Sequence, residues 1–309
     1  MATLRDLFLK QILSEMHRRE DIFFLTADFG APALDQLKAD FPDRYINVGV
    51  AEQNMINTAV GLAKEGATVF CFAIAPFVTM RCFEQLRTCI SVFGKYTPLN
   101  INLIGVGAGV SYDMSGPTHH CFEDLAITNM LPRFDVFSPS DGSLIKQAFQ
   151  HSINCASPMY LRFDSKALPV LKQFDADWKF SDGFRIIEER QNSSLLISTG
   201  YATHVALNAA ADVNHGIDVI DVFCLGNAFK RGLSRQLKKY DNVCCLYEGF
   251  KWAGGLDTYV LECADIGRLK NFESLGFSDY CFSLGKRELL WQEGGVSEDH
   301  IRKVLEAFY

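Results

Sequence analysis

Short runs of apolar residues, separated by helix-like stretches, constrain the fold of this 309-residue chain most strongly. Strands that are apolar throughout are typical of a parallel sheet covered by helices on both faces. In the first half we expect strands at residues 22–26, 45–48, 68–73, 100–106, 135–138 and 159–162. Helices are expected at residues 4–19, behind a Thr3 cap, and at 52–64, 79–93, 122–131 and 142–154. This pattern predicts an α/β fold with a doubly wound, mostly parallel sheet.

A smaller α/β pattern follows residues 166–182, which have no clear period and read as a linker. Strands are expected there at residues 194–199, 218–223, 242–247 and 280–284. Helices are expected at residues 202–213 and 234–239, after Gly254-Gly255 to about residue 263, and at 297–308. We therefore predict a first domain over residues 1–168, a linker over 169–182 and a second domain over 183–309.

Composition excludes several classes of function. The net charge is −7 and no run of lysine or arginine occurs, so nucleic acid is not an expected partner. No apolar stretch is long enough to cross a membrane, and the N-terminus lacks the apolar core of a signal peptide. Ten cysteines, without a Cys-x-x-Cys pair or zinc-ligand spacing, indicate free thiols in a reducing compartment. We expect a cytoplasmic, soluble protein.

Three polar or glycine-rich stretches follow predicted parallel strands, at residues 27–30, 49–53 and 105–120. Ligands of open α/β sheets bind outside the carboxyl ends of the strands, where these stretches lie. The third stretch contains four glycines and is long for a connection, which is typical of functional loops. Neither a dinucleotide fingerprint nor a P-loop is present, which argues against nucleotide phosphate binding.

Two motifs in these stretches closely resemble the transketolase family. They are Arg-Tyr-Ile-Asn-Val-Gly-Val-Ala-Glu-Gln-Asn-Met at residues 44–55 and Gly-Pro-Thr-His-His-x-x-Glu-Asp at residues 116–124. Phe-Glu-Gln-Leu-Arg at 83–87, Ser-Pro-Ser-Asp at 138–141 and Gly-Gly-Leu at 254–256 stand at the expected places. The resemblance covers essentially the whole chain. It implies the pyrimidine-binding domain and the C-terminal domain of a transketolase.

The resemblance also implies thiamine diphosphate and Mg²⁺ as cofactors. Transketolases hold both through a separate domain with a Gly-Asp-Gly motif, which this chain lacks. The chain therefore resembles the C-terminal subunit of a split transketolase, with no metal ligands of its own. The implied partner is an N-terminal subunit carrying the diphosphate-binding domain, in an α2β2 assembly with active sites between subunits.

Two residues carry the catalytic roles that the resemblance implies. Glu52 matches the glutamate that hydrogen-bonds N1′ of the aminopyrimidine, and burial of a carboxyl group favours the protonated form that this role needs. Alternatively, Glu52 is a glutamate favoured by the positive end of a helix dipole. His119 matches the histidine that faces the reacting centre, where it would donate to a substrate oxygen. The alternative is a loop histidine bonded to backbone carbonyls.

Three further residues are implied to contact the cofactor. Phe77 matches a phenylalanine that stacks on the aminopyrimidine, although with 25 phenylalanines in the chain a core role is an alternative. Phe83 is a weaker match, because the segment before it varies in length within the family. Asp28 matches an aspartate that approaches the cofactor, or it caps the turn that follows.

The substrate side departs from sugar-phosphate transketolases. Gly107 stands where they carry a histidine, Ser115 where they carry an aspartate, and Ser165 about where they carry a phosphate-binding arginine. Arg162 is nearby, at a position that the family often fills otherwise. Arginine suits phosphate because its planar fork binds two oxygens. The changes put a pentose phosphate in doubt and favour ketol or acyl transfer to an unusual sugar, modified or nucleotide-linked.

Other interpretations stay open at this point. The β subunit of a 2-oxoacid dehydrogenase has the same architecture and cofactor, although the Gly-Pro-Thr-His-His loop favours transketolase. A fragment of a deoxyxylulose-phosphate synthase fits less well, since that enzyme is one chain. The non-enzyme alternative is a structural or regulatory subunit that has lost catalysis, against which the retained Glu52 and His119 argue.

Overall fold

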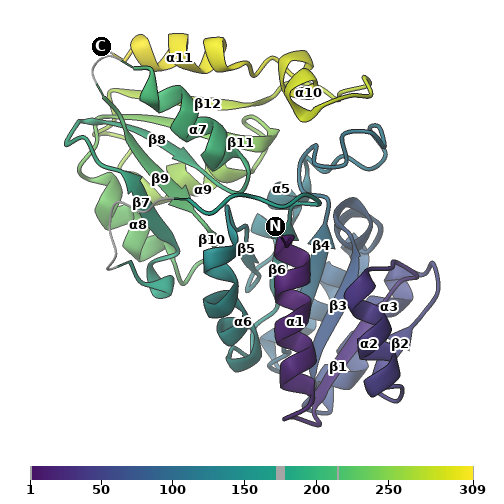
Figure 1. Ribbon diagram of the computed structural model, residues 1–309. Helices are drawn as coiled ribbons and strands as arrows, with labels where there is room; N and C mark the ends of the chain where they lie inside the picture. The colour runs from purple at the N-terminus through teal and green to yellow at the C-terminus, as the bar shows by residue number, and fades with distance from the viewer. Residues whose placement is uncertain (1, 172–177, 214–215, 309) are drawn as a thin grey trace.

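A computed structural model describes residues 2–171, 178–213 and 216–308, which form two sheets, each covered by helices (Figure 1). In spatial order, the larger sheet contains β10 (Cys224–Leu225), β5 (Asp135–Phe137), β6 (Met159–Phe163), β4 (Ile101–Val106), β3 (Thr68–Ile74), β1 (Ile22–Thr26) and β2 (Tyr45–Asn47). The smaller contains β12 (Asn271–Phe277), β11 (Asn242–Phe250), β8 (Ser194–Ser198), β9 (Asp218–Val222) and β7 (Phe184–Glu188). All neighbours are parallel except β10 with β5 and β7 with β9. The predicted α/β class is confirmed.

Successive side chains along each strand point to opposite faces, so the larger sheet packs against two hydrophobic cores. In β3, Phe70 and Phe72 face a phenylalanine-rich core under α1 (Leu4–Met16), α2 (Pro32–Asp40) and α6 (Ile145–Asn154). Val69 and Cys71 face the opposite side, where α3 (Glu52–Lys64) and α5 (Asp124–Asn129) pack. This arrangement explains why the strands are mostly apolar. Thr3 caps α1 as predicted, its hydroxyl accepting from the Asp6 backbone N–H.

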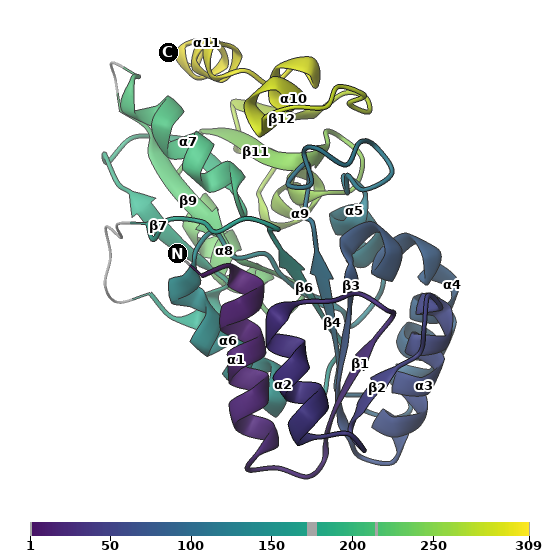
Figure 2. The same cartoon turned by 45° about the vertical axis from the view of Figure 1, so that its right-hand side comes forward.

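Helices also cover both faces of the smaller sheet. One face packs on α7 (Ala202–Ala211), α10 (Arg287–Glu293) and α11 (Glu298–Glu306). The other packs on α8 (Lys230–Leu237) and α9 (Leu256–Cys263), and this apolar core is continuous with the core that holds α3 and α5. Figure 2 shows α5 and α9 close together between the two sheets.

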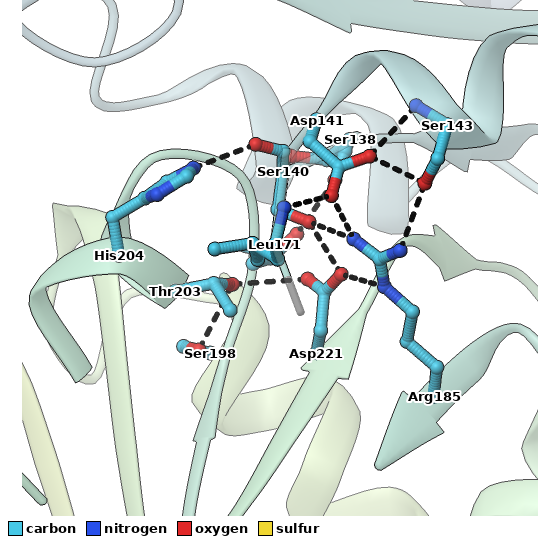
Figure 3. A network of polar contacts seen from close by, with 11 residues as sticks. Ser138, Ser140, Asp141, Ser143, Leu171, Arg185, Ser198, Thr203, His204 and Asp221 are labelled. Atoms are coloured by element: carbon cyan, nitrogen blue, oxygen red, sulfur yellow. Dashed lines mark hydrogen bonds and ion pairs between the residues drawn. The ribbon is translucent and has the colours of Figure 1, made fainter. Parts of the chain in front are cut away.

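A buried polar network joins the two halves of the chain (Figure 3). Arg185 on β7 is fully buried, with Nε 2.9 Å from Asp221 Oδ2 and Nη2 2.8 Å from Asp141 Oδ2. It also donates to the Ser140 and Ser143 hydroxyls, at 2.8 and 3.0 Å. Residues 138–141, which the resemblance singled out, therefore meet the smaller sheet through Arg185.

A second buried cluster lies nearer the loop at residues 105–120. Arg287 on α10 donates to Glu248 and, at 2.6 Å, to Asp164 Oδ2. A Cβ at Gly109 would lie 2.1 Å from Glu248 Oε2, so only glycine fits there. The close approach of Glu248 to residue 109 thus fixes this loop against the second half of the chain.

The predicted strand at residues 280–284 is wrong. That segment is irregular, with Phe282 and Leu284 exposed, and the Phe282 and Ser283 N–H groups donate to Glu293. The strand lies instead at β12, an edge strand whose first residues are exposed. The predicted helix at 79–93 is also different, because it divides into π-helical η1 (Phe77–Arg81), α4 (Phe83–Gln85), π-helical η2 (Leu86–Val92) and 3₁₀ η3 (Phe93–Lys95).

Several elements were not predicted from the sequence: α2, α10, β7, β10, β12 and the 3₁₀ helix η5 (Phe180–Asp182). The helix predicted at 142–154 is present, and its first turn is the 3₁₀ helix η4 (Gly142–Leu144). Part of the predicted linker, residues 172–177, lies outside the described residues, and the domain boundaries stay a prediction. All ten cysteines are free, eight of them buried. None of the helices in the described ranges is long and apolar enough to cross a membrane.

Candidate functional site

Four of the five predicted site residues follow neighbouring strands of the larger sheet. Asp28 comes after β1, Glu52 after β2, Phe77 after β3, and His119 lies in the loop after β4. These strands are parallel, so their carboxyl ends share one edge of the sheet. Contacts among the described residues bring three of them, Glu52, Phe77 and His119, into one cluster.

Glu52 is the first residue of α3 and only 4% exposed. Its Oε1 accepts a hydrogen bond from Arg81 Nη1 at 2.9 Å. The apolar side of the helix, including Met55 and Ile56, packs into the core and holds the carboxylate in place. Cys82 lies beside this carboxylate, and burial, with Glu52 as a second cause, raises the pKa of its thiol to about 12. A rigid, buried acid therefore stands at this edge of the sheet.

Arg81 connects Glu52 to an aromatic pair. Its Cζ lies 3.7 Å from the centroid of the Phe77 ring, so the guanidinium covers that ring. The His119 ring meets Phe77 at a centroid distance of 5.5 Å and an angle of 64°. Arg81 was not among the predicted residues. Its position four residues after Phe77 was the available signal, since such spacing places two helical side chains on one face.

His119 is half-buried and held by its own loop. Its Nδ1 lies 3.1 Å from Thr118 Oγ1, and its backbone N–H donates to the Gly116 carbonyl at 3.0 Å. The Tyr112 ring packs edge-on to it at 6.3 Å. Of the two imidazole nitrogens, Nε2 has no hydrogen-bond partner within the described ranges and is therefore the one available to a substrate.

Asp28 and Phe83 lie apart from this cluster. Asp28 is exposed, has a φ of 56°, and accepts at 3.0 Å from Asn47 Nδ2 rather than capping its own turn. The pair ties the loops after β1 and β2 together. Phe83 packs partly on the core and lines a separate cavity with Arg87 and Met130. Among the described residues, no hydrogen bond, ion pair or ring contact joins Phe83 to Glu52, Phe77 or His119.

The substrate-side departures have structural counterparts. At Gly107, φ is 104° and a Cβ would lie 2.3 Å from Tyr112 Cδ2, so the tyrosine ring fills the space that a larger side chain would need. Ser165 donates to the Ser111 carbonyl at 2.8 Å and thus tethers the loop. Ser115 is exposed. Tyr112 was missed by sequence reasoning because nothing in the pattern links it to residue 107.

Arg162 is buried, and its guanidinium is already hydrogen-bonded within the protein. Its Nε donates to Asp124 Oδ2 at 2.8 Å, and its Nη2 donates to the Glu248 carbonyl at 2.8 Å. Tyr160 donates to the same Asp124 oxygen at 2.8 Å. Arg162 therefore has a structural role, as the partner of the buried Asp124 carboxylate. Burial raises the pKa of the neighbouring Cys121 thiol well above its usual value, so it is no thiolate nucleophile at neutral pH.

Comparisons with known proteins identify relatives of this chain. The family profile described as "Transketolase, pyrimidine binding domain" matches residues 1–170. The chain is 26% identical over 304 residues to an apulose-4-phosphate transketolase subunit of Actinobacillus succinogenes, covering 96% of each chain. It is 26% identical over 311 residues to a 6-deoxy-6-sulfo-D-fructose transketolase subunit of a Clostridium species, covering 96% of this chain and 94% of that one.

Longer relatives match over part of their length. Rat transketolase is 31% identical over 214 residues, which span 68% of this chain and 33% of that protein. Among solved structures, "Split gene transketolase, inactive beta4 tetramer" shares the fold with a TM-score of 0.81 at 24% identity, covering 99% of this chain and 97% of that one. Campylobacter jejuni transketolase superposes with a TM-score of 0.83 at 17% identity, over 46% of its length.

Proposed function

Because the chain belongs to the transketolase family, we propose that it is the C-terminal subunit of a split transketolase that transfers a two-carbon ketol unit with thiamine diphosphate. One observation carries the proposal: a buried carboxylate, Glu52, lies beside the Phe77–His119 pair at the carboxyl edge of the parallel sheet. Two relatives that are themselves named as transketolase subunits match nearly the whole of this chain, which supports a separate subunit.

The residues of this cluster fit the pyrimidine half of that cofactor. A protonated or shared Glu52 carboxyl group would hydrogen-bond N1′, and the Phe77 ring would stack on the aminopyrimidine. When bound, thiamine diphosphate supplies the electron sink that stabilises a carbanion. Glu52 controls the proton at N1′, and burial in the helix start keeps its carboxyl group oriented. His119 Nε2 donates to the substrate oxygen on which negative charge develops.

The diphosphate and Mg²⁺ are proposed to belong to a partner subunit. This chain has no Gly-Asp-Gly motif, and the cluster around Glu52 offers one cation, Arg81, which is already paired. Val50, Met80 and Met114 lie near Glu52, Arg81 and His119 in sequence and expose apolar side chains. Exposed apolar groups beside a site favour a protein surface that covers it. We propose an α2β2 assembly with Asp28 facing the shared cofactor site.

The proposed substrate is a non-standard sugar. The two full-length relatives are named for different compounds, apulose 4-phosphate and 6-deoxy-6-sulfo-D-fructose, so this kind of subunit serves more than one sugar. In this chain Tyr112 fills the space at Gly107, Ser165 tethers its loop, and Arg162 is engaged with Asp124. The groups that would bind a pentose phosphate are thus replaced, which supports a modified sugar.

Co-expression with a subunit that carries Gly-Asp-Gly tests the proposal. The complex should bind thiamine diphosphate with Mg²⁺ in calorimetry and transfer a ketol unit between sugars. Glu52→Gln should lower turnover by at least about 100-fold, as expected for loss of a proton-transfer group. Glu84→Gln is the matched control, since Glu84 is exposed on α4 and pairs only with the exposed Arg87 within the described chain.

Four outcomes would contradict the proposal or one part of it. Turnover of Glu52→Gln within about threefold of wild type would remove the role of Glu52. Decarboxylation of 2-oxoacids in place of ketol transfer would identify the dehydrogenase-type alternative. A complex that assembles but binds no thiamine diphosphate would identify a catalytically silent subunit. Full activity with xylulose 5-phosphate and ribose 5-phosphate would refute the non-standard substrate.

A further inference from the structure

Arg81 contacts two side chains of the candidate site at once. Its guanidinium lies 3.7 Å over the Phe77 ring, and its Nη1 lies 2.9 Å from Glu52 Oε1. These are the two groups to which the proposed function assigns the aminopyrimidine ring. His119 meets the Phe77 ring at 64°, so the guanidinium is the planar group that covers the ring.

We propose that Arg81 occupies the aminopyrimidine half of the cofactor site in the free subunit and must swing away when the cofactor binds. This inference rests on the proposed function, because it takes thiamine diphosphate as the ligand of Glu52 and Phe77. Arg81 is thereby assigned a gating role, which no sequence motif indicated.

The similar chemistry of a guanidinium and an aminopyrimidine explains why Arg81 can occupy the place of the cofactor ring. A guanidinium is planar, carries N–H donors along its edge and binds an aromatic face through cation–π attraction. An aminopyrimidine is also planar, carries an amino donor beside a ring nitrogen and stacks on an aromatic face. Each of these flat groups can hydrogen-bond one carboxylate along its edge while its face stacks on one aromatic ring. At 3.7 Å the guanidinium is already in van der Waals contact with Phe77, so a second ring cannot enter on that face.

The burial of Glu52 explains why its carboxylate needs a partner before the cofactor binds. The Glu52 side chain is 5% exposed, and a buried carboxylate without a partner is unfavourable. Arg81 supplies that partner before the cofactor arrives. Its own side chain is 44% exposed, so it can leave toward solvent at small cost in packing. Arg81 ends the π-helical turn η1, a kind of local helix widening that is frequent at functional sites.

The exchange has a measurable cost for cofactor binding. A ligand that binds only the open state has an apparent Kd equal to its intrinsic Kd divided by the open fraction. If the Arg81-occupied state is about nine times more populated than the open state, removing Arg81 tightens binding about tenfold. Loss of one positive charge alone acts in the opposite direction, because the diphosphate is anionic.

Calorimetric titration of thiamine diphosphate, with Mg²⁺ present, into complexes carrying Arg81→Ala or Arg87→Ala tests the inference. Arg87 is the matched control, since it is an exposed arginine on the following turn and pairs with exposed Glu84. We expect the Kd of Arg81→Ala to fall three- to tenfold and that of Arg87→Ala to change less than twofold. Arg81→Lys keeps the charge and loses the planar stack, so its Kd should lie between wild type and Arg81→Ala.

A second measurement needs neither the partner nor turnover. The isolated subunit is titrated with 4-amino-5-hydroxymethyl-2-methylpyrimidine, which lacks the diphosphate, and binding is followed by ligand-observed NMR. Arg81→Ala should bind this fragment more tightly than wild type and Arg87→Ala. Equal or weaker binding by Arg81→Ala in both titrations would overturn the inference while leaving the proposed function intact. Failure of the wild-type complex to bind thiamine diphosphate would remove both.

Discussion

Replacement of Arg185 by methionine should destabilise the chain strongly. The change removes a fully buried cation from between Asp141 and Asp221, both of which are also fully buried. Breaking one buried ion pair by deleting a partner costs about 3–5 kcal/mol, because the remaining charge is buried and unpaired. Here two carboxylates and two serine hydroxyls lose one donor group, so we expect the upper part of that range.

The loss of stability in Arg185→Met should depend on pH, and the direction of this dependence follows from the pKa values of the two aspartates. Burial raises the pKa of Asp141, but Arg185 and hydrogen bonds outweigh it and hold that pKa below its usual value. Burial raises the pKa of Asp221, which Arg185 only partly offsets. Without Arg185 both folded-state pKa values rise. Stability from a raised carboxyl pKa is present at low pH and is lost as the pH rises through that value. The deficit should therefore be smaller at pH 4.5 than at pH 7.5.

Urea unfolding and thermal melting at both pH values measure the effect. At about 2 °C per kcal/mol, the melting temperature at pH 7.5 should fall by roughly 8–10 °C. Arg190→Met is the control, since Arg190 lies just beyond β7 and forms an exposed pair with Glu188 worth less than about 1 kcal/mol. If Arg185→Met lost no more stability than Arg190→Met, or lost the same amount at both pH values, the buried-charge reasoning would be refuted.

Two further variants probe the substrate side of the site. Gly107→Ala should lower the free energy of unfolding in urea by about 2–4 kcal/mol, because the φ of 104° disfavours a Cβ and the Cβ would meet Tyr112. Adding Tyr112→Ala should recover only the part of this loss that comes from the steric clash. Full recovery would contradict the contribution of the backbone conformation. Arg162→Leu should cost about 3–5 kcal/mol by leaving the buried Asp124 carboxylate without its cation. The double variant with Asp124→Leu should regain at least half of that loss in the same assay. An Arg162→Leu variant as stable as wild type would show that the pair is not buried as described.

Sequence reasoning predicted the central strands well because burial on both faces makes them mostly apolar, as in β3 and β4. It missed three of the four edge strands, β7, β10 and β12. β12 begins with exposed residues and β10 has only two, whereas the apolar segment at 280–284 is largely exposed and irregular. Edge strands have one neighbour, so their composition is less constrained and the pattern is weaker.

The candidate site shows the same limit at the level of side chains. Strand ends placed Glu52 and His119 near one edge, since parallel strands finish together. The contact between Glu52 and Arg81 joins segments 29 residues apart and depends on a π-helical turn, which no periodicity indicated. Likewise, Gly107 was noted as a departure, but the ring that makes it necessary belongs to Tyr112. Tertiary contacts of this kind are not local properties of the sequence.

The short strand β10 has a consequence for any attempt to divide the protein. Cys224 and Leu225 come from the second half of the chain, yet they pair antiparallel with Phe137 and Val136 of β5 and form the border of the larger sheet. A fragment ending near residue 170 would leave the outer backbone groups of β5 without this partner, and an open strand border invites pairing with other chains. Such a fragment is expected to self-associate, because the stretch that the family profile recognises depends on its neighbour to cover one border of its sheet.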